Sequence, residues 1–184
     1  MRIRPYEPGD KEDVRFICLN SEGPCDMDAR GCHFILTTYC DYYIEKEPEN
    51  CFVAVNDENR AVGYIICTEN YDRFRPVFLR EYVPRIPAED PERREDAVNS
   101  TLLQEKFKAL YPAHLHIDLL PEYQRMGLGH RLVDTLRAHL KEKNVPGVML
   151  TVGGQNRVGQ SFYKKYGFER LDETPGDVAF GIRT

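Results

Sequence analysis

The pattern of apolar and polar positions predicts strands and helices in alternation along much of the chain. The apolar runs 51–55 and 61–67 are joined by Asn56-Asp57-Glu58-Asn59, which predicts a β-hairpin. The C-terminal half predicts strands over 114–120, 148–152, 168–171 and 178–182, with helices over 127–143 and 156–166. Because successive strands separated by a helix pair in parallel, the expected fold class is α/β, or mixed α+β.

The N-terminal half is less regular. A short strand at Ile3 precedes a predicted helix with Asp10 as its N-cap and an apolar face formed by Val14, Phe16 and Ile17. A further helix is expected over 34–44. Segment 71–112 is rich in proline and charge, with one predicted helix over about 92–110. We interpret it as a helical insertion that either packs at the sheet edge or forms the wall of an acceptor site.

Composition limits the classes of function. With 184 residues and 41% hydrophobic residues, the chain suits a single domain, 1–184, with one core. The net charge of −5 argues against binding to nucleic acid or an anionic membrane through bulk charge. No apolar run reaches the roughly 20 residues that span a bilayer.

The six cysteines all precede residue 70, with neither a C-x-x-C pair nor a recognised zinc spacing. We therefore expect free thiols and no metal. Met1 to Arg4 leads into polar residues without a signal-peptide apolar segment, so a cytoplasmic location is expected.

One segment has the pattern of a phosphate-binding loop. After the strand over 114–120 the chain passes through a proline and two glycines into an amphipathic helix. Gly127 and Gly129 would let the backbone approach a ligand, and the N–H groups of the new helix favour an anion. The alternative is a tight connection in which the glycines serve only the turn. The candidate ligand-binding residues are Gln124, Arg125, Met126, Gly127, Leu128, Gly129 and His130.

A second motif runs Asn156-Arg157-Val158-Gly159-Gln160-Ser161-Phe162-Tyr163-Lys164-Lys165-Tyr166-Gly167-Phe168. Together the two segments resemble the GNAT family of acyl-CoA-dependent N-acyltransferases, in order, spacing and expected elements. The start of the chain, Ile3-Arg4-Pro5-Tyr6, and the run from Cys51 to Tyr64 also look like this family. The ending looks in particular like the acetyltransferase-like domain of eukaryotic O-GlcNAc hydrolases and its stand-alone bacterial relatives.

The resemblance implies a central mixed, twisted sheet of six to seven strands, with helices on both faces and a V-shaped splay between the fourth and fifth strands. It implies acetyl-CoA as cosubstrate, with its pantetheine arm paired to backbone groups near Ile117 and Leu119. Asn156 would contact the coenzyme, although an Asn before a helix is also an ordinary N-cap. Tyr163 would contact the coenzyme and act as general acid, with Phe162 packed inward; the alternative is that Tyr163 is a core aromatic.

The general base is not determined by the motifs. His114, His116 and Asp118 alternate along one strand, so their side chains share a face unless a bulge intervenes. We take His116 and Asp118 as candidates, with a buried polar network as the alternative. Five basic residues surround the expected coenzyme mouth and either bind its phosphates or are merely solvated: Arg125, Arg131, Arg157, Lys164 and Lys165.

The expected function is acetyl transfer from acetyl-CoA to an amine, a small molecule or a peptide or protein lysine, by direct attack in a ternary complex. The protein would be a monomer or homodimer. One alternative is a catalytically inactive pseudo-acetyltransferase that serves as a binding module. Another is a non-haem iron site built from His116 and Asp118 with His130 or His139.

Overall fold

The computed structural model describes residues 1–184 and contains one seven-stranded sheet in the order β1-β2-β3-β4-β5-β7-β6. Neighbouring strands run antiparallel except β4 and β5, which are parallel. This is a mixed α/β fold, as predicted. The strands are β1 (Arg2–Pro5), β2 (Phe52–Val55), β3 (Ala61–Thr68), β4 (Ala113–Leu119), β5 (Gly147–Gly153), β6 (Glu169–Glu173) and β7 (Asp177–Arg183).

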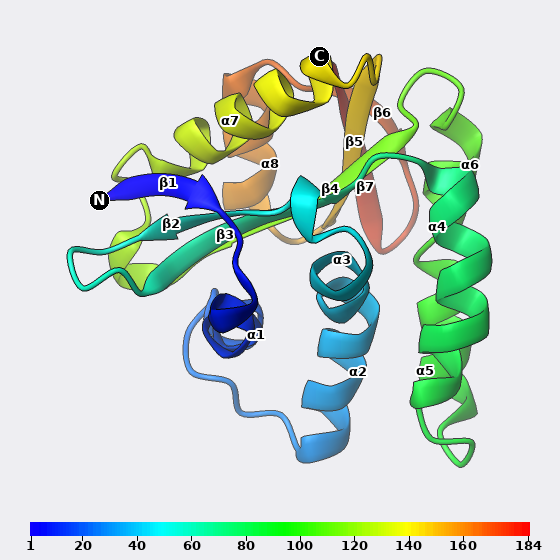
Figure 1. The fold of residues 1–184 in the computed structure, drawn as a ribbon. Coiled ribbons are helices and arrows are strands. Elements are labelled where there is room, and N and C mark those ends of the chain that lie inside the picture. Colours follow the sequence, from blue (N-terminus) through cyan, green and yellow to red (C-terminus); the bar gives the residue numbers. More distant parts are fainter.

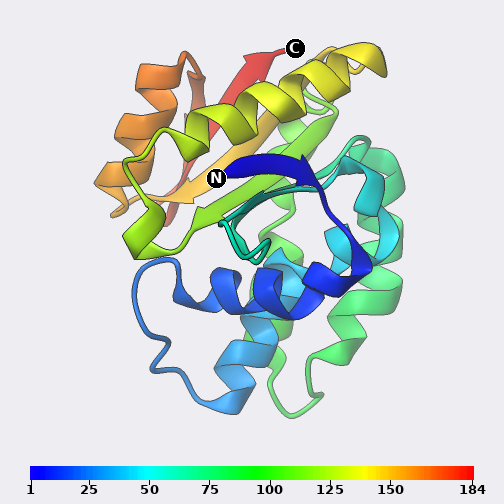
Figure 2. The same ribbon diagram turned by 60° about the vertical axis from the view of Figure 1, so that its left-hand side comes forward.

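Helices cover both faces of the sheet (Figure 1). One face carries α7 (Leu128–Glu142) and α8 (Arg157–Tyr166). The other carries α1 (Lys11–Asn20), α2 (Ala29–Tyr39) and α3 (Asp41–Lys46), with the insertion beside them. The turned view in Figure 2 shows the same two layers, with α7 lying along the sheet. The insertion forms α4 (Tyr71–Val77), α5 (Pro91–Asn99) and α6 (Leu102–Phe107).

The alternation of side chains along the strands divides the core between the two faces. On β3, Tyr64 and Ile66 belong to the cluster beneath α1–α4, whereas Ile65 and Cys67 belong to the cluster beneath α7 and α8. Five residues of α7 are fully or almost fully buried in the second cluster: Leu128, Leu132, Val133, Leu136 and Leu140. Burying such a side chain contributes about 1.5–3 kcal/mol, so this face anchors α7 and the loop that precedes it.

The two central strands part after a short contact. β4 pairs with β5 only at Ala113–Val148 and His114–Met149, although each strand continues well beyond these pairs. Each remains bonded to its outer neighbour, β4 to β3 and β5 to β7. The predicted V-shaped splay therefore exists between the fourth and fifth strands of the sheet.

Two predicted helices prove to be broken. The helix expected over 34–44 begins earlier, at Ala29, and stops at Cys40, so that α3 is separate and buries Tyr42, Tyr43 and Ile44. The helix expected over 92–110 is divided at Ser100 and Thr101, whose hydroxyls donate to the carbonyls of Ala97 and Val98. Such side-chain bonds compete with the backbone hydrogen bonds of a helix. The spacing of apolar residues contains no information about them.

Two predictions for the first helix are corrected by the structure. Asp10 is the N-cap residue of α1, as predicted, but its side chain makes no capping bond, because its carboxylate pairs with Arg4 and accepts the N–H of Glu7. Phe16, expected on the buried face, is 58% exposed. Val14 and Ile17 are buried in the core, and Cys18 and Leu19 pack against it. No helix combines the length and the apolar character that crossing a membrane requires.

Candidate active site

The splay leaves backbone groups of β4 without strand partners. The β3–β4 register runs without a shift from Gly63–Leu119 to Thr68–His114, and the N–H of Leu120 donates to Val62. In an antiparallel pair the bonding direction alternates, so the backbone groups of Ile117 and Leu119 face the β5 side. The Leu119 carbonyl accepts from Gln124 Nε2 at 3.0 Å. The N–H and C=O of Ile117 and the N–H of Leu119 therefore face the open splay.

At the end of the splay, the loop before α7 presents a row of free donors. The first helical bond runs from Arg131 N–H to the carbonyl of Gly127 at 3.2 Å, and no N–H from Arg125 to His130 donates within the chain. Gly127 has φ +79° and Arg125 has φ +60°, the left-handed region that turns successive N–H groups outward. Nothing lies within 4 Å of where a Gly127 side chain would project. This geometry is that of an anion-binding helix N-terminus.

The second glycine has a packing role. A Cβ on Gly129 would come within 3.1 Å of the Phe162 ring, so its absence lets α7 approach α8 closely. Leu128 and Gly129 are buried, whereas Gln124, Arg125, Met126, Gly127 and His130 are exposed. The His130 ring stands edge-on to Phe162, with ring centroids 5.1 Å apart. The exposed part of the predicted motif and the free N–H groups at the start of α7 thus lie on one surface.

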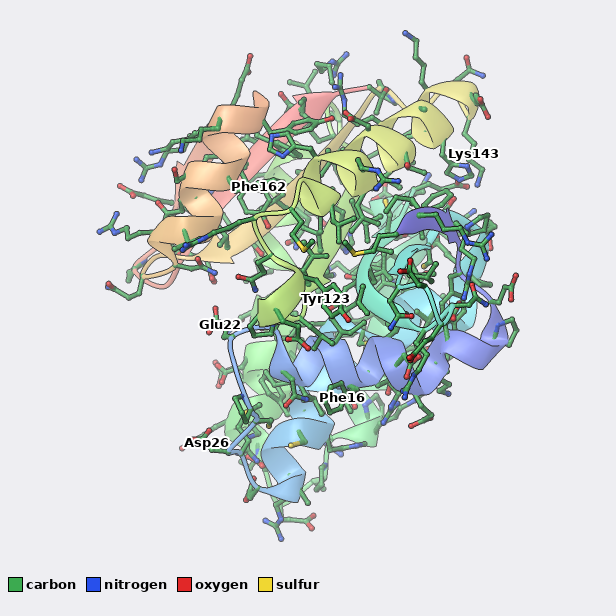
Figure 3. The ribbon with its side chains drawn as sticks, turned by 90° about the vertical axis from the view of Figure 1, so that its left-hand side faces the viewer. Phe16, Glu22, Asp26, Tyr123, Lys143 and Phe162 are labelled. Atoms are coloured by element: carbon green, nitrogen blue, oxygen red, sulfur yellow. The ribbon has the colours of Figure 1, made fainter.

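The loop between α1 and α2 closes one side of this surface. Gln124 Nε2 donates to the carbonyl of Ser21 at 2.9 Å as well as to that of Leu119. Asn156 Oδ1 accepts the N–H of Gly159 at 2.7 Å, so Asn156 is an N-cap of α8, and its amide donates to Glu22 at 3.3 Å. Figure 3 shows Glu22 beside the turn that carries Tyr123. The side chains of both motifs are tied to one loop that neither motif contains.

Tyr163 is more deeply placed than expected. Its ring packs against Phe168 and Phe180 and it is 9% exposed, whereas Phe162, predicted to point inward, is only half-buried over Gly129. Burial, together with the negative charge of Asp118, raises the pKa of the Tyr163 hydroxyl far above its ordinary value. Tyr163 is therefore both a core aromatic and a phenol that stays protonated close to Asp118.

The three polar side chains of β4 share the face toward α1–α3, because no bulge interrupts the strand. The Tyr43 hydroxyl lies 2.8 Å from His114 Nε2 and 3.0 Å from His116 Nε2. The Tyr64 hydroxyl donates to Asp118 Oδ2 at 2.5 Å across the β3–β4 pair. Exposure rises along β4 where β5 diverges: His114 is buried, and the strand is half-buried from His116 onward.

These environments give the candidate bases different pKa values. Burial raises the pKa of Asp118 to about 6, although hydrogen bonds from Tyr64 and Ser21 lower it and the charge of Glu22 raises it. Burial lowers the pKa of His116 to about 4 and that of His114 well below its usual value. At neutral pH, Asp118 is ionised and both imidazoles are neutral, so Asp118 is the stronger base.

The insertion packs against the sheet, the first of its two predicted roles, whereas the acceptor-site wall stays a prediction. Its large aromatic residues are buried in the core beside α3: Tyr71, Phe74, Phe78 and Tyr82. Ser100 and Thr101, at the break between α5 and α6, and Gln104 of α6 line a small cavity with His114, His116 and Thr151 of β5. The insertion therefore packs against the sheet and walls the polar side of the splay.

The remaining candidates are scattered. The basic residues Arg125, Arg131, Arg157, Lys164 and Lys165 are all exposed. The alternative iron triad is not assembled: His130 stands edge-on to Phe162 and His139 bonds Asn50, whereas His116 bonds Tyr43 on the opposite face of the sheet. No group of three or more His, Cys, Asp or Glu is arranged to hold a metal ion. All six cysteines are free thiols.

The sequence model of the acetyltransferase (GNAT) family matches residues 19–168, most of the chain. The chain belongs to the GNAT family. Its structure is similar to the crystal structure of SsHAT, with 28% sequence identity, a TM-score of 0.87, and 99% of this chain and 97% of that one covered.

Two more distant solved structures share the fold. The PaiA N-acetyltransferase from Thermoplasma acidophilum, solved in complex with coenzyme A, is 18% identical, with a TM-score of 0.62 over 100% of this chain and 98% of that chain. Ard1 from Thermoplasma volcanium is 20% identical, with a TM-score of 0.64 over 99% of this chain and 96% of that chain.

Sequence reasoning missed several residues of the site. Tyr64 could have been found by pairing the hairpin strand with β4, because register places it opposite Asp118. Tyr43, Ser21 and Glu22 reach the site from the N-terminal helices and their loop, far from β4 in sequence. No local pattern marks them.

Proposed function

We propose that this GNAT protein transfers an acetyl group from acetyl-CoA to a primary amine by direct attack in a ternary complex. One observation carries the proposal. β4 and β5 part after His114–Met149, and the backbone groups that this exposes on β4 lead to the row of free N–H donors from Arg125 to His130. An open strand edge that ends in an anion site suits a ligand with an amide-rich arm and a pyrophosphate.

The residues present fit coenzyme A. The N–H groups from Arg125 to His130 would bind the pyrophosphate, helped by the α7 dipole and by exposed Arg125 and Arg157. The free N–H and C=O of Ile117 would pair with the pantetheine amides as a neighbouring strand does, which leaves the N–H of Leu119 for the thioester end of the arm. Bound in this way, acetyl-CoA supplies an activated thioester. The Asn156 amide, which now donates to Glu22, is positioned to meet the arm.

Two side chains, Asp118 and Tyr163, would carry out the proton transfers. Asp118, ionised at neutral pH and oriented by Tyr64, would remove a proton from the acceptor ammonium. Tyr163, held protonated by burial, would donate to the leaving thiolate from the other side of the sheet. The N–H of Leu119 would stabilise the developing negative charge on the carbonyl oxygen.

The proposal extends to the acceptor, the location and the subgroup. The acceptor is a small amine or a peptide or protein lysine, since an acidic chain favours a cationic partner. We propose a cytoplasmic monomer or homodimer with reduced thiols. The likeness of its ending to the acetyltransferase-like domain of O-GlcNAc hydrolases supports membership of that subgroup. The intact Gly127 turn and Tyr163 favour an active enzyme over a pseudo-acetyltransferase.

Two measurements test this function separately. Calorimetric titration should show one acetyl-CoA site per chain, and binding of coenzyme A should compete with it. A panel of amines, screened by detection of released thiol, should reveal at least one acceptor. Binding without thiol release across the panel would indicate the binding module, and absence of binding would refute the coenzyme site itself.

A further inference from the structure

The Tyr43 hydroxyl joins the two histidines of β4 into one hydrogen-bonded chain. Tyr43 is 1% exposed, and its oxygen lies 2.8 Å from His114 Nε2 and 3.0 Å from His116 Nε2. A phenol has one proton, so it donates to one imidazole and accepts from the other. Because both imidazoles are neutral, one histidine bears its proton on Nε2 and the other on Nδ1.

The two distances favour one of the two arrangements. Hydrogen bonds donated by O–H are typically shorter than those donated by N–H. The shorter contact therefore fits Tyr43 donating to His114, and the longer one fits His116 Nε2–H donating to Tyr43. In this arrangement the His114 proton is on Nδ1, and His116 Nδ1 carries a free lone pair.

A cavity beyond His114 fits the same arrangement. It measures about 10 Å³, the space of one water molecule, and lies between α2, the α5–α6 break and the central strands. Three buried polar atoms of its lining have no partner in the chain: Thr38 Oγ1, Gln104 Oε1 and His114 Nδ1. Their residues are 3%, 5% and 2% exposed. Leaving such buried atoms unpaired is unfavourable, and one water with these three partners would satisfy them.

We propose that a water molecule in this cavity, with His114 and Tyr43, holds His116 in the tautomer protonated on Nε2. The water accepts from His114 Nδ1–H and donates to Gln104 Oε1 and Thr38 Oγ1. His116 Nδ1 is then a hydrogen-bond acceptor where β4 and β5 part, and it orients the acceptor amine through one N–H. The role of His116 in orienting the amine rests on the proposed function, whereas the tautomers and the water do not depend on it. Tyr43, His114 and Gln104 are positioning residues.

The chain offers a matched pair of variants. Tyr43→Phe removes the hydroxyl between the histidines, whereas Tyr42→Phe removes the neighbouring hydroxyl, which bonds Glu47 at 3.0 Å. Both tyrosines are buried on α3, so a general loss of packing affects both variants alike. Only the first should change the histidines.

Nitrogen NMR of histidine-labelled protein tests the tautomers without requiring activity. We expect His116 to be protonated on Nε2 and His114 on Nδ1 in the wild type and in Tyr42→Phe. In Tyr43→Phe, His116 should become a mixture of tautomers. Gln104→Met, which removes the cavity acceptor, should shift the His114 signal. The opposite tautomers in the wild type, or equal effects of Tyr42→Phe and Tyr43→Phe, would overturn the proposal.

Kinetics and crystallography complete the test. If an acceptor is found, Tyr43→Phe should raise its KM about tenfold, the effect of one lost orienting hydrogen bond, while acetyl-CoA affinity stays unchanged. A high-resolution crystal structure should contain the cavity water in the wild type, and its absence would contradict the inference. If no amine is acetylated, the proposed function fails, and the NMR result still decides the tautomers.

Discussion

The two faces of β4 serve different purposes although they share one strand of seven residues. Leu115, Ile117 and Leu119 pack toward α7 and α8, and the free backbone groups of Ile117 and Leu119 point in the plane of the sheet, toward the edge that β5 leaves open. His114, His116 and Asp118 point toward α1–α3 into a network of tyrosine hydroxyls. The coenzyme side, with its open edge, is suited to binding through the main chain, and the polar side to handling protons through side chains.

This difference teaches how the fold separates affinity from chemistry. Strand periodicity of two assigns alternate residues to opposite faces, and the splay opens both faces at the same point. Substitutions on the coenzyme side should therefore change acetyl-CoA affinity. Substitutions on the polar side should change turnover and its pH dependence.

The largest effect is expected at the loop before α7. Gly127→Trp should reduce acetyl-CoA affinity by more than about 100-fold, because the side chain would project into open space over the free N–H groups. Calorimetry measures this. Gly127→Ala is the matched control: it carries the same left-handed backbone strain, about 1–2 kcal/mol, without the bulk. Wild-type affinity in the tryptophan variant would refute the assignment of the anion site.

On the polar face, Asp118→Asn should lower kcat about 1,000-fold and leave the acetyl-CoA dissociation constant unchanged, since it removes the base alone. In the wild type, kcat/KM should fall as the pH drops through about 6. Tyr64→Phe removes a hydrogen bond that lowers this pKa, so the midpoint should move upward. A profile with no midpoint near this pH would assign the base elsewhere.

Tyr163 lies between the two functions, because it is on the coenzyme side yet senses the charge of Asp118. Tyr163→Phe should lower turnover about 100-fold, with less than a threefold change in acetyl-CoA affinity. The ring packing against Phe168 and Phe180 is retained in this variant, so stability should change little. Equal losses in affinity and turnover would make Tyr163 a packing residue only.

The smallest effect concerns stability. The pKa of Asp118 is raised to about 6 in the folded chain, above its ordinary value near 4, so its stabilising contribution is full at low pH and lost as the pH rises through 6. Asp118→Asn should therefore be more stable than the wild type at pH 7.5, on the order of 1–2 kcal/mol, with the difference vanishing near pH 4. Thermal unfolding at both pH values measures this, and a pH-independent difference would argue against a buried carboxylate.

The local features of the molecule followed from the sequence alone. The hairpin, the α7 and α8 helices, the turn at Gly127 and the N-cap at Asn156 each depend on residues close together in the chain. The resemblance to the GNAT family, which two motifs carry, then implied the sheet and its splay. The errors, a side-chain cap at Asp10 and two uninterrupted helices, arose where a side chain bonds a group outside the expected pattern.

Only the tertiary structure decided the polar side of the site. Sequence alternation placed His116 and Asp118 on one face but gave no means of ranking them as bases. That ranking depends on burial and on hydroxyls from other elements: Tyr64 beside Asp118, and Tyr43 between the histidines. A pKa is set by all the groups around a side chain, and those groups are brought together by packing rather than by proximity in the chain.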